Sequence, residues 1–223
     1  YLANGSNQGT SWRANSFNDA SWSTGNAEFG YGDGDEATVV SYGSNASSKY
    51  ITTYFRKSIT ITTPSAYTGM TLGILRDDGA VVYVNGTERY RTNMPTGNIG
   101  FKTVASTTIS GAGETTWNTV ALSSSFFTSG TNVIAVEVHQ VSKSDPDVSF
   151  NLYLTADQAA CGVPTNISAS GITSSSALVS WTAATGGPSS YDVMYQVNGA
   201  PSWIGPINTT STSLTLSGLN YNT

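Results

Sequence analysis

The chain has 223 residues, of which 38% are hydrophobic, so it is long enough for one or two globular domains with a sizeable core. A net charge of −5, with only 10% charged residues, excludes the basic surface expected of a nucleic-acid-binding protein. No apolar run approaches the roughly 20 residues of a membrane-spanning helix, and a single Cys with a single His excludes a Cys/His zinc site within the chain.

The first two thirds of the chain contain four segments with the composition of β-strands. They are rich in β-branched and aromatic residues, and no window of about a dozen residues has the apolar spacing of a helix. Asn85-Gly86 follows the second segment, and this dipeptide between apolar runs predicts a hairpin. The sequence therefore predicts an all-β fold, a sandwich or a barrel. The four segments are Tyr50–Ile61, Ala80–Val84, Asn132–Val138 and Val148–Leu154.

A stretch containing Gly and Pro near Ala159 separates this part from the remainder. We interpret residues 159–164 as a linker between a domain at residues 1–158 and a second domain at residues 165–223. Short alternating segments in the second domain predict the strands of a small sandwich. These segments are Ala177–Thr182, Tyr191–Gln196 and Ser213–Ser217.

The C-terminal part carries a pattern made of Pro164, Val179–Trp181, Tyr191–Val193 and Leu214–Thr223. With these residues it resembles a fibronectin type III domain, an immunoglobulin-like sandwich. The resemblance implies that the last strands of the domain are missing, which would leave a strand edge open. We therefore expect the chain to be part of a larger polypeptide. Cys161-Gly-Val-Pro is similar to the opening of secreted bacterial members, which close with a second cysteine; the alternative is a free linker thiol.

The N-terminal part carries a second, longer pattern. It comprises Trp12, Phe17, Asp19, Trp22, Phe29–Asp35, Tyr54–Lys57, Asp77–Gly86, Arg91–Pro95, Asn132–Gln140 and Ser149–Leu152. With these residues it resembles a jelly-roll accessory domain of large secreted bacterial proteins, akin to galactose-binding-like sandwiches. The resemblance implies an extracellular or cell-surface location, in many such proteins reached by type IX secretion. It does not assign an activity, because such domains accompany hydrolases and adhesins alike.

Adjacent carboxylates at Asp77 and Asp78 form the first candidate site. Two such groups repel each other unless a positive charge lies beside them, and a calcium ion with oxygen ligands would provide it. The pattern Asp-Asp-Gly before a strand and Asn-Gly is similar to that of protective-antigen-type lectin domains, in which the aspartates hold calcium. The alternative is a plain turn, with Arg76 offsetting the charge.

Asp33 and Asp35 form a second acidic cluster within a glycine-containing loop. Their spacing departs from that of an EF-hand, so they are candidate ligands of a structural ion or simply loop residues. A third acidic turn contains Asp145 and Asp147, and we interpret it as an ordinary loop.

His139 ends a predicted strand and shares a face with Glu137, opposite the apolar residues of that strand. We interpret it as a hydrogen-bonded structural residue, because a general base needs a nucleophile and the sequence contains no recognisable one. No pair of carboxylates is singled out for glycoside hydrolysis either. We therefore expect the chain not to be an enzyme in itself.

Aromatic rings near predicted loops are candidates for stacking on sugars, and polar groups beside them for bonding sugar hydroxyls. Trp12, Trp22 and Phe55 are expected in the core instead. The carbohydrate-binding candidates are Tyr31, Tyr42, Tyr90, Arg91, Asn93 and Trp117.

These observations favour a non-catalytic binding module of a secreted or cell-surface bacterial protein, with carbohydrate as its ligand and calcium as a candidate cofactor. The alternatives are a structural spacer, a docking or adhesin unit of a surface filament, and the accessory region of a larger secreted hydrolase. The expected partners are a polysaccharide or glycan and the rest of the parent polypeptide or a neighbouring chain.

Overall fold

The computed structural model describes residues 1–158 and 162–219, and it confirms the all-β prediction. The chain forms two units, Tyr1–Pro64 with Thr68–Asp157 and Ser65–Tyr67 with Gln158–Thr223. The strands are β1 (Phe29–Tyr31), β2 (Thr38–Val39), β3 (Thr52–Ile61), β4 (Tyr67–Asp77), β5 (Gly79–Val84), β6 (Thr87–Thr92), β7 (Asn118–Leu122), β8 (Gly130–His139), β9 (Val148–Gln158), β10 (Thr165–Ser170), β11 (Ser176–Thr182), β12 (Tyr191–Tyr195), β13 (Ile204–Thr209) and β14 (Ser213–Ser217). Single turns of 3-10 helix are η1 (Ser11–Arg13), η2 (Pro64–Ala66), η3 (Gly111–Gly113) and η4 (Ser124–Phe126).

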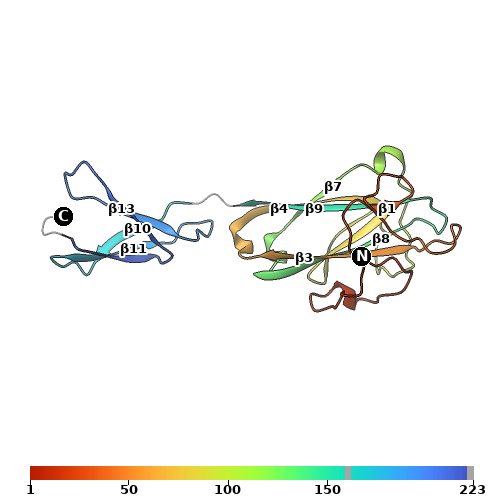
Figure 1. Cartoon of the computed structure of the whole chain (residues 1–223), viewed down its shortest axis with the longest axis horizontal. Coiled ribbons are helices and arrows are strands. Elements are labelled where there is room, and N and C mark those ends of the chain that lie inside the picture. Colours follow the sequence, from red (N-terminus) through yellow and green to blue (C-terminus); the bar gives the residue numbers. More distant parts are fainter. Residues whose placement is uncertain (159–161, 220–223) are drawn as a thin grey trace. The chain divides into compact units, whose positions relative to one another are not determined.

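The first unit is a sandwich of two sheets. One sheet has the order β2-β1-β9-β4-β7 and the other β3-β8-β5-β6. Figure 1 shows them as two layers, with β1, β4, β7 and β9 in one and β3 and β8 in the other. Phe55 of β3 and Phe150 of β9 meet between the layers with ring centroids 4.1 Å apart, and Phe29 of β1 packs on both. This aromatic contact joins the two sheets into one core.

The four-stranded sheet is buried on its other face as well. There Trp12 of η1 packs with Tyr54 and Tyr83, and Met94 and Ala105 complete the same apolar cluster. Both faces of β5 are therefore buried, as are those of most of β8. This explains why both segments read as continuous apolar runs rather than as alternating ones.

The strand predictions are confirmed where apolar runs were bounded by turn residues. Tyr50–Ile61, Ala80–Val84, Asn132–Val138 and Val148–Leu154 lie on β3, β5, β8 and β9. Val84 of β5 pairs with Thr87 of β6, so the hairpin at Asn85-Gly86 is confirmed too. Both turn residues have positive φ, 51° for Asn85 and 83° for Gly86, which is the conformation that Asn-Gly adopts readily.

The second unit contains the sheets β10-β11-β14 and β12-β13. Trp181 of β11 packs edge-on against Tyr191 of β12, with centroids 5.3 Å apart, and thereby links these two sheets. The predicted strands of this part lie on β11, β12 and β14. Cys161, with its predicted disulfide or free thiol, lies outside the described residues.

Candidate functional site

Asp77 and Asp78 lie where the chain crosses from one sheet of the first unit to the other. β4 ends at Asp77 in the five-stranded sheet, and β5 begins at Gly79 in the four-stranded one. Both aspartates have 0% exposed surface. The Asp78 carboxylate accepts hydrogen bonds from the backbone N–H of Ile109 and of Val141, each at 2.7 Å. Asp78 is therefore fully engaged in holding two loops.

Asp77 is different, because neither of its carboxylate oxygens has a hydrogen-bond partner. Among the described residues, the other buried side-chain oxygen in this condition is Oε1 of Gln140, a residue that is 1% exposed. The Gln140 Nε2 group is engaged, since it donates to the Tyr31 hydroxyl at 2.5 Å and to the Asp147 carbonyl at 2.8 Å. A buried polar group without a hydrogen-bond partner destabilises the folded state by about 1–3 kcal/mol. The cost is larger for an ionised carboxylate, unless another charge compensates it.

Strand register brings further carboxylates to the same end of the sandwich. Tyr31 of β1 pairs with Val148 of β9, so Asp33, which follows β1, meets Asp147, which precedes β9. With Glu114 from the loop before β7, their carboxylate oxygens all lie within 4.8 Å of one another. Asp77 lies near this group, because the carboxyl groups of Asp78 and Asp147 both contribute to raising its pKa.

These carboxyl groups raise one another's pKa. Burial raises the pKa of Asp77 to about 10, and its neighbours Asp78 and Asp147 add to the rise. Burial also raises the pKa of Asp33 and of Glu114, and in both cases the Asp147 charge contributes. Ionisation of Asp77, Asp33 and Glu114 is therefore disfavoured, and a cation beside their oxygens would favour it.

Burial lowers the pKa of Arg76, and the charges of Asp77 and Asp78 oppose that lowering, so Arg76 partly offsets their charge, as in the plain-turn interpretation. Its guanidinium donates through Nε and Nη2 to Thr92 Oγ1 of β6, at 3.3 and 3.1 Å. We take the carboxyl groups of Asp33, Glu114 and Asp147, the neighbouring Asp77, and Gln140, whose Nε2 donates to the Asp147 carbonyl, as a candidate ligand set and call it the acidic centre. Their side-chain oxygens are carboxylate or amide oxygens, the donors that hard cations such as Ca²⁺ prefer.

The structure brings members of the two predicted acidic clusters to the same end of the sandwich. Asp77 and Asp33 belong to one centre, whereas Asp78 is occupied by backbone N–H groups. Asp35 is exposed, and oxygens of Asp33, Asp35 and Glu36 lie within 4.8 Å of one another, so the predicted pair forms a second carboxylate cluster. Glu36 also accepts from the N–H groups of Asp33 and Gly34. Gln140, Glu114 and Asp147 were not predicted as ligands.

Most of the predicted sugar-binding residues are engaged elsewhere. Tyr31 is only 7% exposed, and the ring of Tyr42 packs edge-on against it at 5.1 Å. Arg91 makes two bonds to the Glu88 carboxylate, at 2.6 and 2.8 Å. Asn93 bonds the carbonyls of Asp78 and Thr107, while Tyr90 is half-buried on β6. Tyr31, Arg91 and Asn93 are thus engaged in contacts within the protein. A role in sugar binding stays a prediction for them, as it does for Tyr42 and Tyr90.

Trp117 differs from the others, because it is 39% exposed and contacts a second exposed ring. Tyr153 of β9 is 37% exposed, and the two ring centroids are 4.8 Å apart with an interplanar angle of 51°. Between their strands lies Gly73 of β4, where a Cβ atom would stand 2.2 Å from Tyr153 Cζ. The missing side chain of Gly73 therefore leaves room for the Tyr153 ring to pack against β4.

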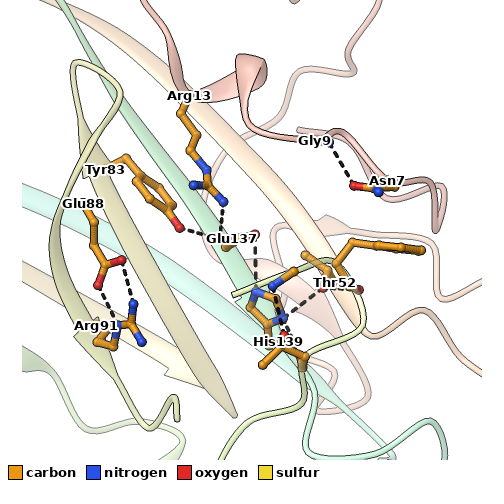
Figure 2. Close-up of polar contacts among 12 residues, drawn as sticks. Asn7, Gly9, Arg13, Thr52, Tyr83, Glu88, Arg91, Glu137 and His139 are labelled. Carbon is orange, nitrogen blue, oxygen red and sulfur yellow. Dashed lines mark hydrogen bonds and ion pairs between the residues drawn. The ribbon is translucent and has the colours of Figure 1, made fainter. Parts of the chain in front are cut away.

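A separate buried polar network lies on the four-stranded sheet (Figure 2). The Glu137 carboxylate accepts from the Tyr83 hydroxyl at 2.6 Å and from Arg13 Nη2 at 3.2 Å, and its other oxygen lies 3.5 Å from His139 Nε2. His139 Nδ1 lies 2.7 Å from the Thr103 carbonyl and 3.0 Å from Thr52 Oγ1. These contacts place His139 within a structural network, as interpreted from the sequence.

Comparison with known proteins adds a family match for the C-terminal part. Residues 162–223 match the model of the fibronectin type III domain, so the predicted resemblance of this part is confirmed. No curated protein matches the chain. Among the described residues, no helix is long and apolar enough to cross a membrane.

Similar solved structures are enzymes of much greater length. An α-L-rhamnosidase of Streptomyces avermitilis is 23% identical, with a TM-score of 0.35, and the match covers 49% of this chain and 9% of that one. A β-glucuronidase of Bacteroides uniformis is 12% identical, with a TM-score of 0.42, covering 95% of this chain and 24% of that one. A β-glucuronidase of Ruminococcus gnavus is 11% identical, with a TM-score of 0.29, covering 77% and 30%. The chain thus spans less than a third of each.

Proposed function

We propose that the first unit is a non-catalytic carbohydrate-binding module, in which a calcium ion at the acidic centre holds the loops. The observation that carries the sugar site is the exposed pair of Trp117 and Tyr153. Removing aromatic surface from water is favourable. The C–H face of a pyranose ring can cover the two aromatic rings while the sugar hydroxyls remain in contact with water. The pair therefore has the chemistry of a sugar platform.

The surroundings of this platform support the proposal. On β9 the side chains alternate, so Asn151 and Ser149 lie on the same face as Tyr153. Thr119 pairs with Gly73 and is exposed, which adds a hydroxyl on the neighbouring strand. Ser149 in turn donates to the Asp33 carboxylate at 2.9 Å. The aromatic pair, these polar side chains and the acidic centre therefore follow one another along the same face of the five-stranded sheet.

In this proposal the calcium ion is structural, and Asp77 does not touch the sugar. Asp77 and Asp78 are fully buried, so they are out of reach of a ligand on the surface. The centre instead ties together the loops that follow β1 and β8 and precede β7 and β9. Extracellular calcium modules bind with dissociation constants of about 10⁻⁴–10⁻³ M, which suits the proposed location outside the cell and within a larger secreted polypeptide.

Replacing Trp117 by Ala is the direct test of the sugar site. We expect Trp117→Ala to weaken glycan binding by roughly 30-fold, because truncating a central aromatic contact costs about 2 kcal/mol. The measurement is a glycan array with the full chain, followed by calorimetry on the best ligand. Trp203→Ala is the matched control, since Trp203 is 60% exposed in the second unit. Equal loss in both variants, or a blank array with the native chain, would refute the proposal.

The glycine beneath the platform gives a second test that removes no aromatic ring. In Gly73→Ala the new methyl group would collide with Tyr153 Cζ, so the ring must move off β4. We expect glycan affinity to fall roughly tenfold, as for the loss of about 1.4 kcal/mol of stacking. Gly69→Ala is the control on the same strand, because its methyl group would meet only Asp157 Oδ2, at 3.5 Å. Unchanged affinity in Gly73→Ala would show that the platform is not the site.

A further inference from the structure

The lysines of this acidic protein are concentrated at one place. The sequence contains four lysines, and three of them, Lys49, Lys102 and Lys143, line a single pocket of the first unit with a volume of about 230 Å³. No carboxylate lines this pocket. The protein as a whole carries a net charge of −5, whereas the lining of this pocket is positively charged.

The positive charges of this lysine pocket are not used in ion pairs. None of the ion pairs among the described residues involves a lysine. Lys102 and Lys143 are exposed. Lys49 is 7% exposed, and its ammonium donates to the carbonyls of Asp145 and Pro146. The Lys49 ammonium is therefore held in place by hydrogen bonds, whereas Lys102 and Lys143 carry their charges on exposed, flexible side chains.

The remaining lining suits a polar ligand of modest size. Ser6, Ser48 and Tyr50 lie among the lining residues and carry hydroxyl groups. Burial and the charges of Asp78 and Asp147 raise the pKa of Asp145 to about 6, and the Lys49 charge partly offsets that rise. Asp145 does not line the pocket. An entering anion would therefore meet ammonium and hydroxyl donors without a competing carboxylate.

We propose that the lysine pocket binds an anionic group of a saccharide, a carboxylate or a sulfate. That the anion is carried by a saccharide rests on the proposed function, whereas the anion site itself rests on the lysines alone. The pocket is separate from the aromatic pair, because neither Trp117 nor Tyr153 lines it. It would therefore select acidic glycans over neutral ones.

The test compares polysaccharides that differ only in their anionic groups. The pairs are dextran sulfate with dextran, and polygalacturonate with its methyl ester, measured by affinity electrophoresis of the full chain. We expect the charged member to bind at least tenfold more tightly, and added salt to reduce the difference because it screens exposed charges. Lys102→Ala/Lys143→Ala should abolish the preference. Lys57→Ala, the lysine outside the pocket, should retain it.

The outcomes separate this inference from the proposed function. If both members of each pair bind equally and Trp117→Ala abolishes binding, the lysine pocket is refuted and the sugar platform stands. If Lys57→Ala reduces the preference as much as the double variant, the effect is general charge attraction and the pocket is again refuted. If no polysaccharide binds the native chain, both proposals are refuted. If the native chain prefers the charged member in only one of the two pairs, that pair identifies sulfate or carboxylate as the group recognised.

Discussion

Calcium is expected to raise the melting temperature of the first unit by about 5–10 °C over the value in chelator. A ligand at about 100 times its dissociation constant stabilises the native state by about 2.7 kcal/mol, and each kcal/mol shifts the melting temperature of a domain this size by about 2–4 °C. The physical reason lies in the acidic centre, where the Asp77 and Gln140 oxygens, which have no hydrogen-bond partner, would coordinate the ion. Differential scanning calorimetry with and without calcium measures the shift.

Asp77→Asn makes this experiment specific to the centre. In chelator the variant should be at least as stable as the native chain, because burial, Asp78 and Asp147 all oppose ionisation of Asp77. In calcium it should gain little, because an anionic ligand is lost. Asp157→Asn, an exposed aspartate on β9, is the control and should keep the full shift. A native chain indifferent to calcium, or a full shift in Asp77→Asn, would contradict the proposed site.

Glu137→Gln is expected to destabilise the first unit by about 3 kcal/mol in urea unfolding. Glu137 is 1% exposed and accepts from Tyr83 and Arg13, and removing one partner of a buried ion pair typically costs about 3–5 kcal/mol. The loss would also loosen η1, because Arg13 is its last residue.

Glu88→Gln is the matched control for that prediction. Glu88 and Arg91 form an ion pair on β6 with short contacts, visible in Figure 2, but their side chains are 35% and 26% exposed. Solvent screens such a pair, so its removal should cost less than about 1 kcal/mol. Similar losses in the two variants would show that burial does not set the strength of these contacts.

The strands could be predicted from sequence where local pattern decides them. β3, β5 and β8 are apolar and β-branched, and Asn85-Gly86 marks the turn between β5 and β6. β4 escaped notice because Gly69 and Gly73 interrupt its apolar pattern. Gly73 is explained only by Tyr153, whose ring on another strand occupies the place of a side chain at this position.

The acidic centre could be predicted only in part, for a similar reason. Asp77 and Asp33 each stand out locally, but the pairing of Tyr31 with Val148 unites them with Asp147, and no local pattern reveals such a register. Gln140 gives no signal of its own in the sequence. Tyr153 was within reach, because alternation from Phe150 on β9 places it on the outer face.

The position of β9 has a consequence for how the chain is made. β9 lies between β1 and β4 in its sheet, although it is the last strand of the first unit to be synthesised. Until it emerges from the ribosome, β1 with β2 and β4 with β7 are two-stranded ribbons, which are marginally stable in water at best. The five-stranded sheet, and with it the meeting of Asp33, Asp77 and Asp147, therefore forms in one late step, when the nascent chain delivers the strand that joins both ribbons.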